Sequence, residues 1–438
     1  MELTNDYKFK INGDVHIQSV EEYYVLIFKD THKYLVVNND QYNAFEKLKE
    51  GKEVGIVFEN TNIDEELYIN LLSDIFWANT YEEPKKLTDP DQFEIKFDIT
   101  YDCNTRCSHC FLPDFPGMNE ISLEKWKKIS DKIFDNIDYK PYMCISGGEP
   151  LLFSDMLKEL IEYIYPKVES IALLTNGFII SDWIDSGNKE MLDFFTNHIE
   201  TFQISLDGYD EETFDKIRGK GNFKKLVNTV KYFNSIGKPM SLHATVSKEN
   251  IKSIEDNFLN FVTEHDLYGP EKNHFSFSLV RPLGRGKDLE KKGDILNGIQ
   301  FEKFLYGVQE KINEKYPENL MKTDDLLTGT LCSVGRQISV APNGLCYLCG
   351  ISATEPTCNL LEDDFSYIKD KYKKLRESME QKNIEACNDC ELFGFCFGKC
   401  RVINKLETGS YTKINCDDAQ KEEFYRAMVR EKVVGVPF

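Results

Sequence analysis

The stretch CNTRCSHC, residues 103–110, decides the fold because it directly follows a predicted strand, FEIKFDIT (93–100). It separates Cys103, Cys107 and Cys110 by three and then two residues. Thiolates grouped in this way are ligands for zinc, copper(I) or iron-sulfur centres. A closed zinc site needs four ligands, so three cysteines favour an iron-sulfur cluster with one iron left open. On spacing alone, the alternative is a zinc knuckle with His109 as the fourth ligand.

Five further predicted strands follow, each separated from the next by a helical pattern. They are PYMCIS (141–146), SIALLTNG (170–177), TFQISLDG (201–208), MSLHATVS (240–247) and HFSFSLVRP (274–282). This alternation predicts a parallel sheet with right-handed crossovers, and six units predict an α/β fold, a partial (β/α)6 TIM barrel over residues 93–290. Functional loops of such barrels lie at the C-terminal strand ends, so CNTRCSHC is expected at the mouth.

The first 85 residues predict a separate, winged-helix-like module. Two strands are expected in YYVLIFKDTHKYLVVNN (23–39), and helices in DQYNAFEKLKEG (40–51), with Asp40 as N-cap, and in IDEELYINLLSDIFWAN (63–79). Residues 86–92 have the proline and charge content of a linker, and residues 291–330 predict a helical bridging region. A C-terminal domain is expected over residues 331–438, where cysteines cluster.

Composition excludes several classes of function. The chain has 438 residues, 74 acidic against 53 basic, and a net charge of -21, which argues against nucleic-acid binding. No apolar run reaches the length of a membrane helix, and the N-terminus lacks a signal peptide, so a cytoplasmic protein is expected. Thirteen cysteines in a reducing compartment indicate metal or redox chemistry more than disulfides.

The cysteine spacing resembles the signature of the radical S-adenosylmethionine (radical SAM) superfamily, in which the residue before the third cysteine is usually aromatic. The resemblance implies that Cys103, Cys107 and Cys110 hold a catalytic four-iron four-sulfur cluster. It further implies cofactor contacts at successive strand ends. These are His109, the GGEP segment (Gly147, Gly148, Glu149 and Pro150) at the cofactor's amino group, and Asn176, Ser205 and Asp207 near its ribose and carboxylate. Each motif alone can be an ordinary turn, but four of them coincide here.

The later cysteines resemble the SPASM extension, which carries two auxiliary four-iron four-sulfur clusters. The resemblance implies two ligand sets, Cys332, Cys349 and Cys400 for the first cluster, and Cys387, Cys390, Cys396 and Cys416 for the second. Some relatives have another cysteine near the position of Ile338, so the first cluster's fourth iron is open or uses Cys346 or Cys358. Of these, Cys346 is expected to be an inert buried thiol and Cys358 is the candidate ligand, while Cys144 is expected to be core packing. A treble-clef or ribbon zinc domain is the alternative.

The N-terminal module resembles the RiPP recognition element, which binds the leader of a ribosomally made precursor peptide. Strand addition along HKYLVVNN is expected, with Tyr34, Val36, Leu71 and Ile75 lining the groove. The alternative is that these residues are ordinary core.

Taken together, these resemblances imply a radical SAM peptide maturase. It would use S-adenosylmethionine, three four-iron four-sulfur clusters and an external one-electron reductant to abstract hydrogen with a 5'-deoxyadenosyl radical and close a cross-link in the precursor. The first expectation is a carbon-carbon bond of the streptide type, between Lys and Trp. A thioether bond, as in sactisynthases, and oxidation of a protein residue, as in anaerobic sulfatase maturation, are alternatives. A non-catalytic peptide scaffold with structural metals would contain no iron and cleave no cofactor.

Overall fold

The computed structural model describes residues 4–11, 13–81, 92–112, 121–267, 273–316, 334–350, 355–396 and 398–434. The chain divides into two compact units, each assembled from segments that are distant in sequence. The barrel unit contains residues 88–297 and 333–378, and the terminal unit contains residues 1–87, 298–332 and 379–438. Both ends of the chain therefore belong to one unit.

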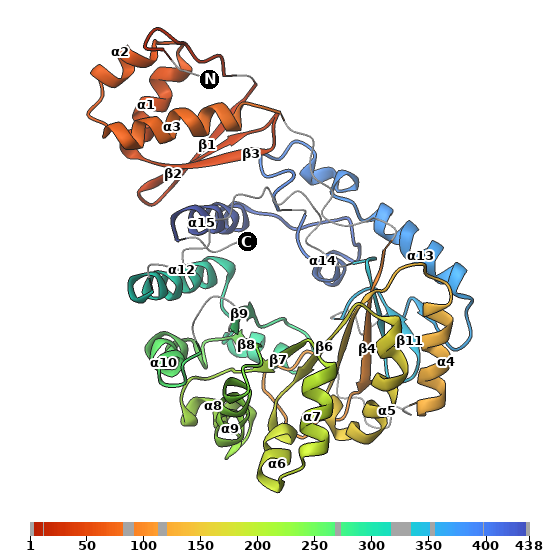
Figure 1. Cartoon of the computed structure of the whole chain (residues 1–438). Helices are drawn as coiled ribbons and strands as arrows, with labels where there is room; N and C mark the ends of the chain where they lie inside the picture. Colours follow the sequence, from red (N-terminus) through yellow and green to blue (C-terminus); the bar gives the residue numbers. More distant parts are fainter. Residues whose placement is uncertain are drawn as a thin grey trace. The chain divides into compact units, whose positions relative to one another are not determined.

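The barrel unit is built on a sheet in which six adjacent strands are parallel and follow one another in chain order (Figure 1). They are β4 (Glu94–Thr100), β5 (Tyr142–Gly147), β6 (Ser170–Thr175), β7 (Thr201–Ser205), β8 (Met240–Val246) and β9 (Asn273–Leu279). All six strands predicted from the sequence are present, with ends shifted by a few residues. This confirms an α/β fold with a mostly parallel sheet.

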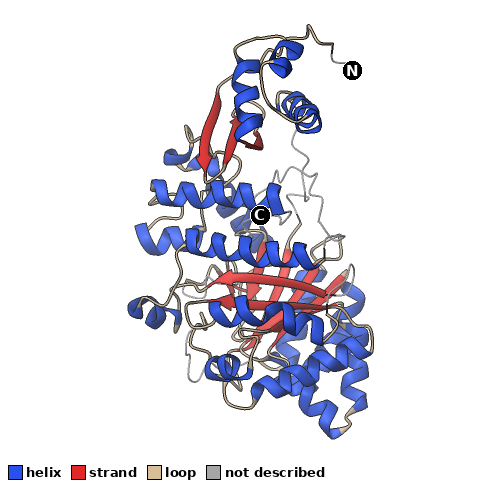
Figure 2. Ribbon diagram, turned by 90° about the vertical axis from the view of Figure 1, so that its left-hand side faces the viewer, coloured by secondary structure: helices blue, strands red, loops and turns tan. Residues whose placement is uncertain are grey.

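Helices connect these strands and cover the sheet (Figures 1 and 2). They are α4 (Leu123–Phe134), α5 (Ser154–Ile164), α6 (Phe178–Ser186), α7 (Lys189–His198), α8 (Glu211–Arg218), α9 (Asn222–Ser235), α10 (Ile251–Glu264) and α11 (Gly286–Lys292). Their apolar faces pack on the strands, and Trp126 of α4 lies against Phe97 of β4 with ring centroids 4.7 Å apart. The sequence did not predict α6 and α8, which are short helices placed directly after strand ends.

Part of the cysteine-rich C-terminal half extends the barrel sheet. β10 (Gln337–Val340) pairs in parallel with β4, and β11 (Leu345–Tyr347) and β12 (Cys358–Asn359) continue the sheet in antiparallel fashion. α13 (Phe365–Ser378) is tied to it by Tyr372, whose hydroxyl donates to the carbonyl of Tyr347 at 2.6 Å. The remaining residues of the expected C-terminal domain, from 379 onward, belong to the terminal unit.

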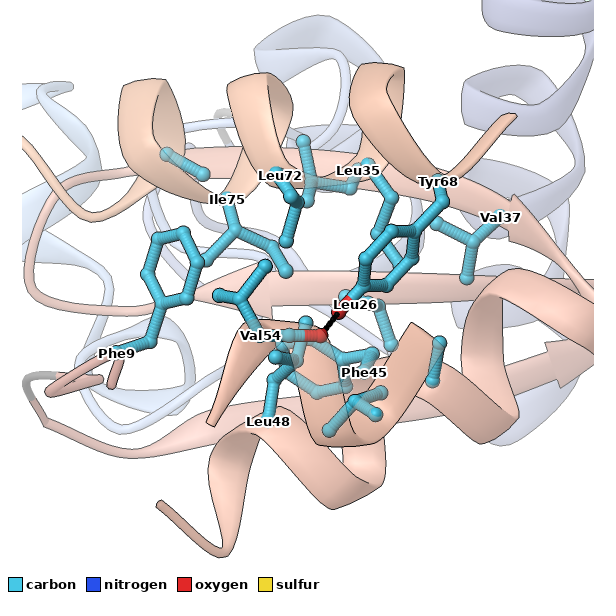
Figure 3. Packing of buried hydrophobic residues seen from close by; sticks show 14 of the residues in the cluster. Phe9, Leu26, Leu35, Val37, Phe45, Leu48, Val54, Tyr68, Leu72 and Ile75 are labelled. Carbon is cyan, nitrogen blue, oxygen red and sulfur yellow. Dashed lines mark hydrogen bonds between the residues drawn. The ribbon is translucent and has the colours of Figure 1, made fainter. Parts of the chain in front are cut away.

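The terminal unit contains a three-stranded antiparallel sheet of β1 (Val15–Val20), β2 (Tyr23–Phe28) and β3 (Lys33–Asn38). α1 (Asn39–Lys49), α2 (Val54–Glu59) and α3 (Glu65–Ala78) pack on one face of this sheet around a core that includes Phe45, Leu72 and Ile75 (Figure 3). β1 and α2 were not predicted. The N-cap of α1 is Asn38 and not Asp40, because Asn38 and Gln41 form a reciprocal capping box.

The other face of the three-stranded sheet is also covered. Val25 and Ile27 of β2 and Tyr34 of β3 pack against α15 (Asp418–Val434) and Leu392. α12 (Gly298–Lys315) lies beside α15, joined to it by Arg430 and Glu302 at 2.7 Å, and α14 (Arg401–Thr408) belongs to the same unit. None of the helices within the described ranges combines the length and apolarity needed to cross a bilayer.

Burial on both faces corrects the expected leader-binding groove. Leu71 and Ile75 are fully buried between α3 and the sheet, and Tyr34 is 7% exposed. These three side chains are core and cannot line an open groove, so the prediction was wrong for them. Val36 is half-buried against the α15 side.

Candidate active site and cysteine-lined cavity

The CNTRCSHC loop begins three residues after β4, at the C-terminal edge of the parallel strands. The Thr105 hydroxyl lies 3.4 Å from Cys103 Sγ and 3.3 Å from Cys107 Sγ, so both sulfurs contact one side chain. The Cys110 amide donates to the Cys107 carbonyl at 3.3 Å and closes the turn. The loop therefore brings the Cys103 and Cys107 sulfurs to one side chain and holds Cys110 in the same turn.

Two later strand ends hold this loop in place. Glu249, which follows β8, accepts a hydrogen bond from Ser108 Oγ at 2.9 Å. Arg285, which follows β9, donates from Nε to the Cys107 carbonyl at 2.8 Å and from its amide to the Cys110 carbonyl at 2.9 Å. The sequence reading missed both residues. Their positions three and six residues after strand ends were the available signal, but Glu and Arg are too common in such loops to stand out.

The GGEP segment packs its backbone against the base of the cysteine loop. The amides of Gly148 and Glu149 donate to the carbonyls of Thr100 and Asp102 at 2.7 and 2.9 Å. A Cβ on Gly147 would lie 2.2 Å from the Thr100 carbonyl oxygen, and one on Gly148 would lie 2.1 Å from that of Asp102. Glycine is thus required here by close backbone approach, and Gly147 also has φ +127°. Pro150 is buried and opens a short 3₁₀ turn, Pro150–Phe153.

Glu149 is fully buried and accepts three hydrogen bonds. Its Oε1 accepts from the Thr175 hydroxyl at 2.8 Å and from the Leu151 amide at 3.2 Å, and its Oε2 accepts from the Asn176 amide at 2.8 Å. Burial raises the pKa of Glu149 to about 7, although these hydrogen bonds lower it. A carboxyl group in this state suits an incoming cation, which would return it to its charged form.

The polar residues at the third and fourth strand ends have different surroundings. Asn176 donates from Nδ2 to Asn104 in the cysteine loop at 2.7 Å. Ser205 ends β7 and pairs with His243 of β8. Asp207 is fully buried, ion-pairs with Arg218, accepts from the Thr245 amide at 2.8 Å, and lies 3.3 Å from His109 Nε2. Asp207 thus contacts His109 directly and is itself held by Arg218 and Thr245. The sequence did not single out Arg218.

Electrostatics within this site follow from burial. Burial raises the pKa of Asp207, but the charges of Arg218 and then His109 outweigh this effect and hold the pKa below its usual value. Burial lowers the pKa of His109 and raises those of the Cys103 and Cys110 thiols. Within the described ranges, no three His, Cys, Asp or Glu side chains converge on a point that would hold a single metal ion. His109 Nε2 faces Asp207, which does not favour the zinc knuckle.

In the terminal unit, the four cysteines expected to hold the second auxiliary cluster line one cavity of about 330 Å³. They are Cys387, Cys390, Cys396 and Cys416. Gly398 donates its amide to Cys396 Sγ at 3.4 Å, and burial raises the pKa of Cys387 to about 11. Four thiols around one space of this size fit a four-iron four-sulfur cluster, in which each thiolate binds a different iron.

The structure does not test the expected ligands of the first auxiliary cluster. Cys332 lies outside the described residues, and Cys349 and Cys400 fall in different compact units. Cys346 and Cys358 are buried and stand opposite each other in β11 and β12. This ligand set stays a prediction.

Cys144 lies in β5 opposite Lys96 of β4, whose ammonium forms a buried ion pair with Asp98 at 2.9 Å. Burial raises the pKa of the Cys144 thiol to about 11. The expected packing role is compatible with this position.

A mostly parallel α/β sheet with three cysteines in the loop after β4 is the arrangement that the sequence predicts for an iron-sulfur domain. Residues 97–259 match the Radical SAM superfamily, and the chain therefore carries a radical SAM domain.

Relatives of known name cover most of the chain. It is 27% identical over 346 residues to the antilisterial bacteriocin subtilosin biosynthesis protein AlbA of Bacillus subtilis, covering 76% of this chain and 72% of that protein. It is 25% identical over 339 residues to the mycofactocin maturase MftC of Mycolicibacterium smegmatis, covering 72% and 79%.

Two solved structures share the fold. SuiB of Streptococcus suis, bound to S-adenosylmethionine, matches with a TM-score of 0.57 and 17% identity, covering 93% of this chain and 99% of that one. The enzyme anSMEcpe, with bound AdoMet and a peptide, matches with a TM-score of 0.61 and 19% identity, covering 78% and 98%.

Proposed function

We propose that this protein is a radical SAM enzyme that closes a cross-link within a ribosomally made precursor peptide. The observation that carries the proposal is the site at the barrel mouth, where the base of the loop that carries Cys103, Cys107 and Cys110 packs against the GGEP segment with its buried Glu149. Bound there, a four-iron four-sulfur cluster and S-adenosylmethionine would supply a carbon radical that removes a hydrogen atom from the peptide. The named relatives support a peptide substrate, since two of them are a bacteriocin biosynthesis protein and a maturase.

The residues at the mouth would bind and orient the cofactor. Glu149 would accept its ammonium group, because a cation there relieves the cost of burying the carboxylate. His109, fixed by Asp207, presents a flat ring beside the cluster cysteines. Thr105, Glu249 and Arg285 would keep the loop rigid.

The cysteine-lined cavity of the terminal unit would hold the second auxiliary cluster, which would accept the electron left after bond formation. The first auxiliary cluster, with Cys332, Cys349 and Cys400, and with Cys358 as its candidate fourth ligand, belongs to the same proposal. An external reductant would supply the first electron. We propose that the protein acts in the cytoplasm, where reducing conditions would keep its cysteines available as cluster ligands.

The leader of the precursor would pair with β3, which is an edge of the three-stranded sheet in the order β1-β2-β3. An extended peptide binds such an edge through backbone hydrogen bonds. Removing the first 85 residues is not a clean test of this step, because it would uncover the apolar face of α15. Hydrogen exchange is cleaner: added leader peptide should slow exchange in Lys33–Asn38 and leave the opposite edge, Val15–Val20, unchanged. Equal effects at both edges would contradict leader pairing with β3.

For the bond formed, we propose carbon-carbon closure between Lys and Trp as the first choice. A structure of SuiB bound to the precursor peptide SuiA matches over 93% of this chain, against 78% for the anSMEcpe structure, which supports a precursor peptide as the substrate. A thioether is the second candidate, supported by the similarity to the subtilosin biosynthesis protein. Either product loses two hydrogens, but only a thioether consumes a cysteine thiol of the peptide, so alkylation before mass spectrometry distinguishes them.

The experiment that tests the proposed function is anaerobic reconstitution followed by iron analysis and assay of 5'-deoxyadenosine. Three clusters correspond to about twelve irons. Changing Cys103, Cys107 and Cys110 together to Ala should leave about eight irons and abolish 5'-deoxyadenosine formation. Zinc in place of iron would overturn the proposal.

A further inference from the structure

A continuous run of polar contacts joins β1 to the wall of the cysteine-lined cavity. His16 stacks on Tyr425 of α15, with ring centroids 6.0 Å apart, and its Nε2 lies 3.1 Å from the Tyr425 hydroxyl. That hydroxyl donates to Glu391 Oε1 at 2.6 Å. Lys421 Nζ donates to both oxygens of Glu391, at 3.1 and 3.2 Å. Segments from the two ends of the chain thus meet in one network within the terminal unit.

The network ends at the cavity itself. Lys421 lines it together with Cys390 and Cys416. Glu391 directly follows Cys390, and its side chain is 14% exposed. Because Glu391 holds the ammonium through both oxygens, the lysine is fixed at the wall in place of swinging freely into water.

A fixed cation beside an iron-sulfur cluster changes its redox equilibrium. The reduced cluster carries one more negative charge than the oxidised cluster, so a nearby ammonium favours the reduced form. Net charge and solvent exposure are among the factors that set the potential of such clusters. Lys421 is positioned to act in this way, and Glu391 moderates its charge while fixing its place.

We propose that His16, Tyr425 and Glu391 are positioning residues that hold Lys421 against the second auxiliary cluster, and that Lys421 raises the reduction potential of this cluster. The inference rests on the proposed function, since it takes Cys387, Cys390, Cys396 and Cys416 as the ligands. It gives the N-terminal sheet a second role beside leader pairing: the sheet helps to set the electrostatic environment of an electron acceptor.

The test is a potentiometric titration followed by electron paramagnetic resonance on full-length, reconstituted protein. The protein carries Ala at Cys103, Cys107 and Cys110, which removes the signal of the cofactor-binding cluster. The signal to follow is the one that disappears when Cys390 and Cys416 are also changed to Ala. If those two changes remove no iron and no signal, the proposed second cluster itself fails, and this outcome is separate from the lysine's role.

With the signal assigned, Lys421→Met should lower the midpoint potential. We expect about a tenfold change in the one-electron equilibrium constant, which is about 59 mV. Lys405→Met on α14 removes the same charge away from the cavity lining and should leave the potential unchanged. Equal shifts in the two variants would overturn the role of Lys421.

The positioning residues are tested separately. Tyr425→Phe removes the hydroxyl that joins His16 to Glu391. His16→Phe keeps an aromatic ring stacked on Tyr425 but removes the imidazole nitrogens of His16. Both should lower the potential by part of the Lys421→Met shift, with full iron content retained. A shift in Tyr425→Phe with none in His16→Phe would overturn the contribution of the N-terminal sheet.

Discussion

The two cysteine sites differ in which parts of the fold support them. The loop at the barrel mouth is held by strand ends of one parallel sheet, through groups such as Asp207, Glu249 and Arg285. The cavity in the terminal unit is held by α15 and by a sheet formed from the first residues of the chain. Parallel strands bring their ends to one edge by topology, whereas the second arrangement depends on packing between chain ends. The first site is therefore readable from the sequence, and the second only in part.

The largest expected effect tests the support of the barrel site. Asp207→Asn keeps the shape of the side chain but removes the charge opposite the buried Arg218. Breaking a buried ion pair by changing one partner costs about 3–5 kcal/mol. We expect a loss of this size in the free energy of unfolding, measured with a denaturant, together with weaker cofactor binding.

Asp182→Asn is the matched control for this change. Asp182 pairs with Lys225 at the surface, where its side chain is 54% exposed, and such pairs contribute about 0–1 kcal/mol. A similar loss in both variants would mean that Asp207 has no special role in supporting the barrel site.

The pH dependence of stability tests whether Glu149 is protonated in the folded protein when no cofactor is bound. Its pKa is raised from 4.5 to about 7, so the protonated form stabilises the folded protein. That contribution is fully present below the unfolded pKa and is lost as the pH rises through about 7. Without cofactor, the wild type should lose roughly 3 kcal/mol of stability relative to Glu149→Gln between about pH 4.5 and about pH 8.

The difference between the two proteins is measured by urea unfolding across this pH range. Any constant cost of placing an amide among three donors cancels, because only the change with pH is compared. A difference that does not vary with pH would show that folding leaves the pKa of Glu149 unchanged, and would contradict the prediction.

Gly148→Ala tests the close backbone contact beneath the cysteine loop. The new Cβ would lie 2.1 Å from the Asp102 carbonyl oxygen, so the GGEP segment and the loop must separate. Overpacking of this kind costs about 1–3 kcal/mol, and we expect a lower thermal midpoint and lost iron at this cluster. Gly307→Ala on α12 is the control, since nothing lies within 4 Å and helix propensity predicts about 0.5–1 kcal/mol of gain. Iron retained in Gly148→Ala would contradict the tight fit.

Sequence reasoning succeeded where chemistry and topology coincide. The six barrel strands were predicted from their apolar runs, and the motifs from the cysteines and turn residues that follow several of these runs. It missed β1, whose His16, Gln18 and Ser19 weaken the strand pattern, and it assigned Tyr34, Leu71 and Ile75 to a groove. For Tyr34 the reason is that β2 and β3 are apolar on both faces, and only α15 explains the second face. Leu71 and Ile75 are instead buried in the core between α3 and the first face of the sheet. Arg218 and Glu391 could not be singled out because charged residues gain meaning only from their three-dimensional neighbours.

The smallest expected effect concerns that second face. The Tyr34 hydroxyl donates to Glu431 Oε2 at 2.7 Å, and both residues are buried. Tyr34→Phe leaves the carboxylate without this donor, which costs about 1–2 kcal/mol in the free energy of unfolding. Tyr367→Phe, at a residue 52% exposed, should change stability by less than about 0.5 kcal/mol.

The position of Tyr34 predicts where the loss will be seen. Its ring meets Phe395 edge-on with centroids 5.7 Å apart, and Phe395 directly precedes Cys396 of the cavity. Hydrogen exchange should therefore quicken around residues 390–396 in Tyr34→Phe while the barrel strands stay protected. If exchange increased in the barrel strands to the same degree, the two cysteine sites would share their support. The contrast between a site held by the strand ends of one sheet and a site held by both chain ends would then fail.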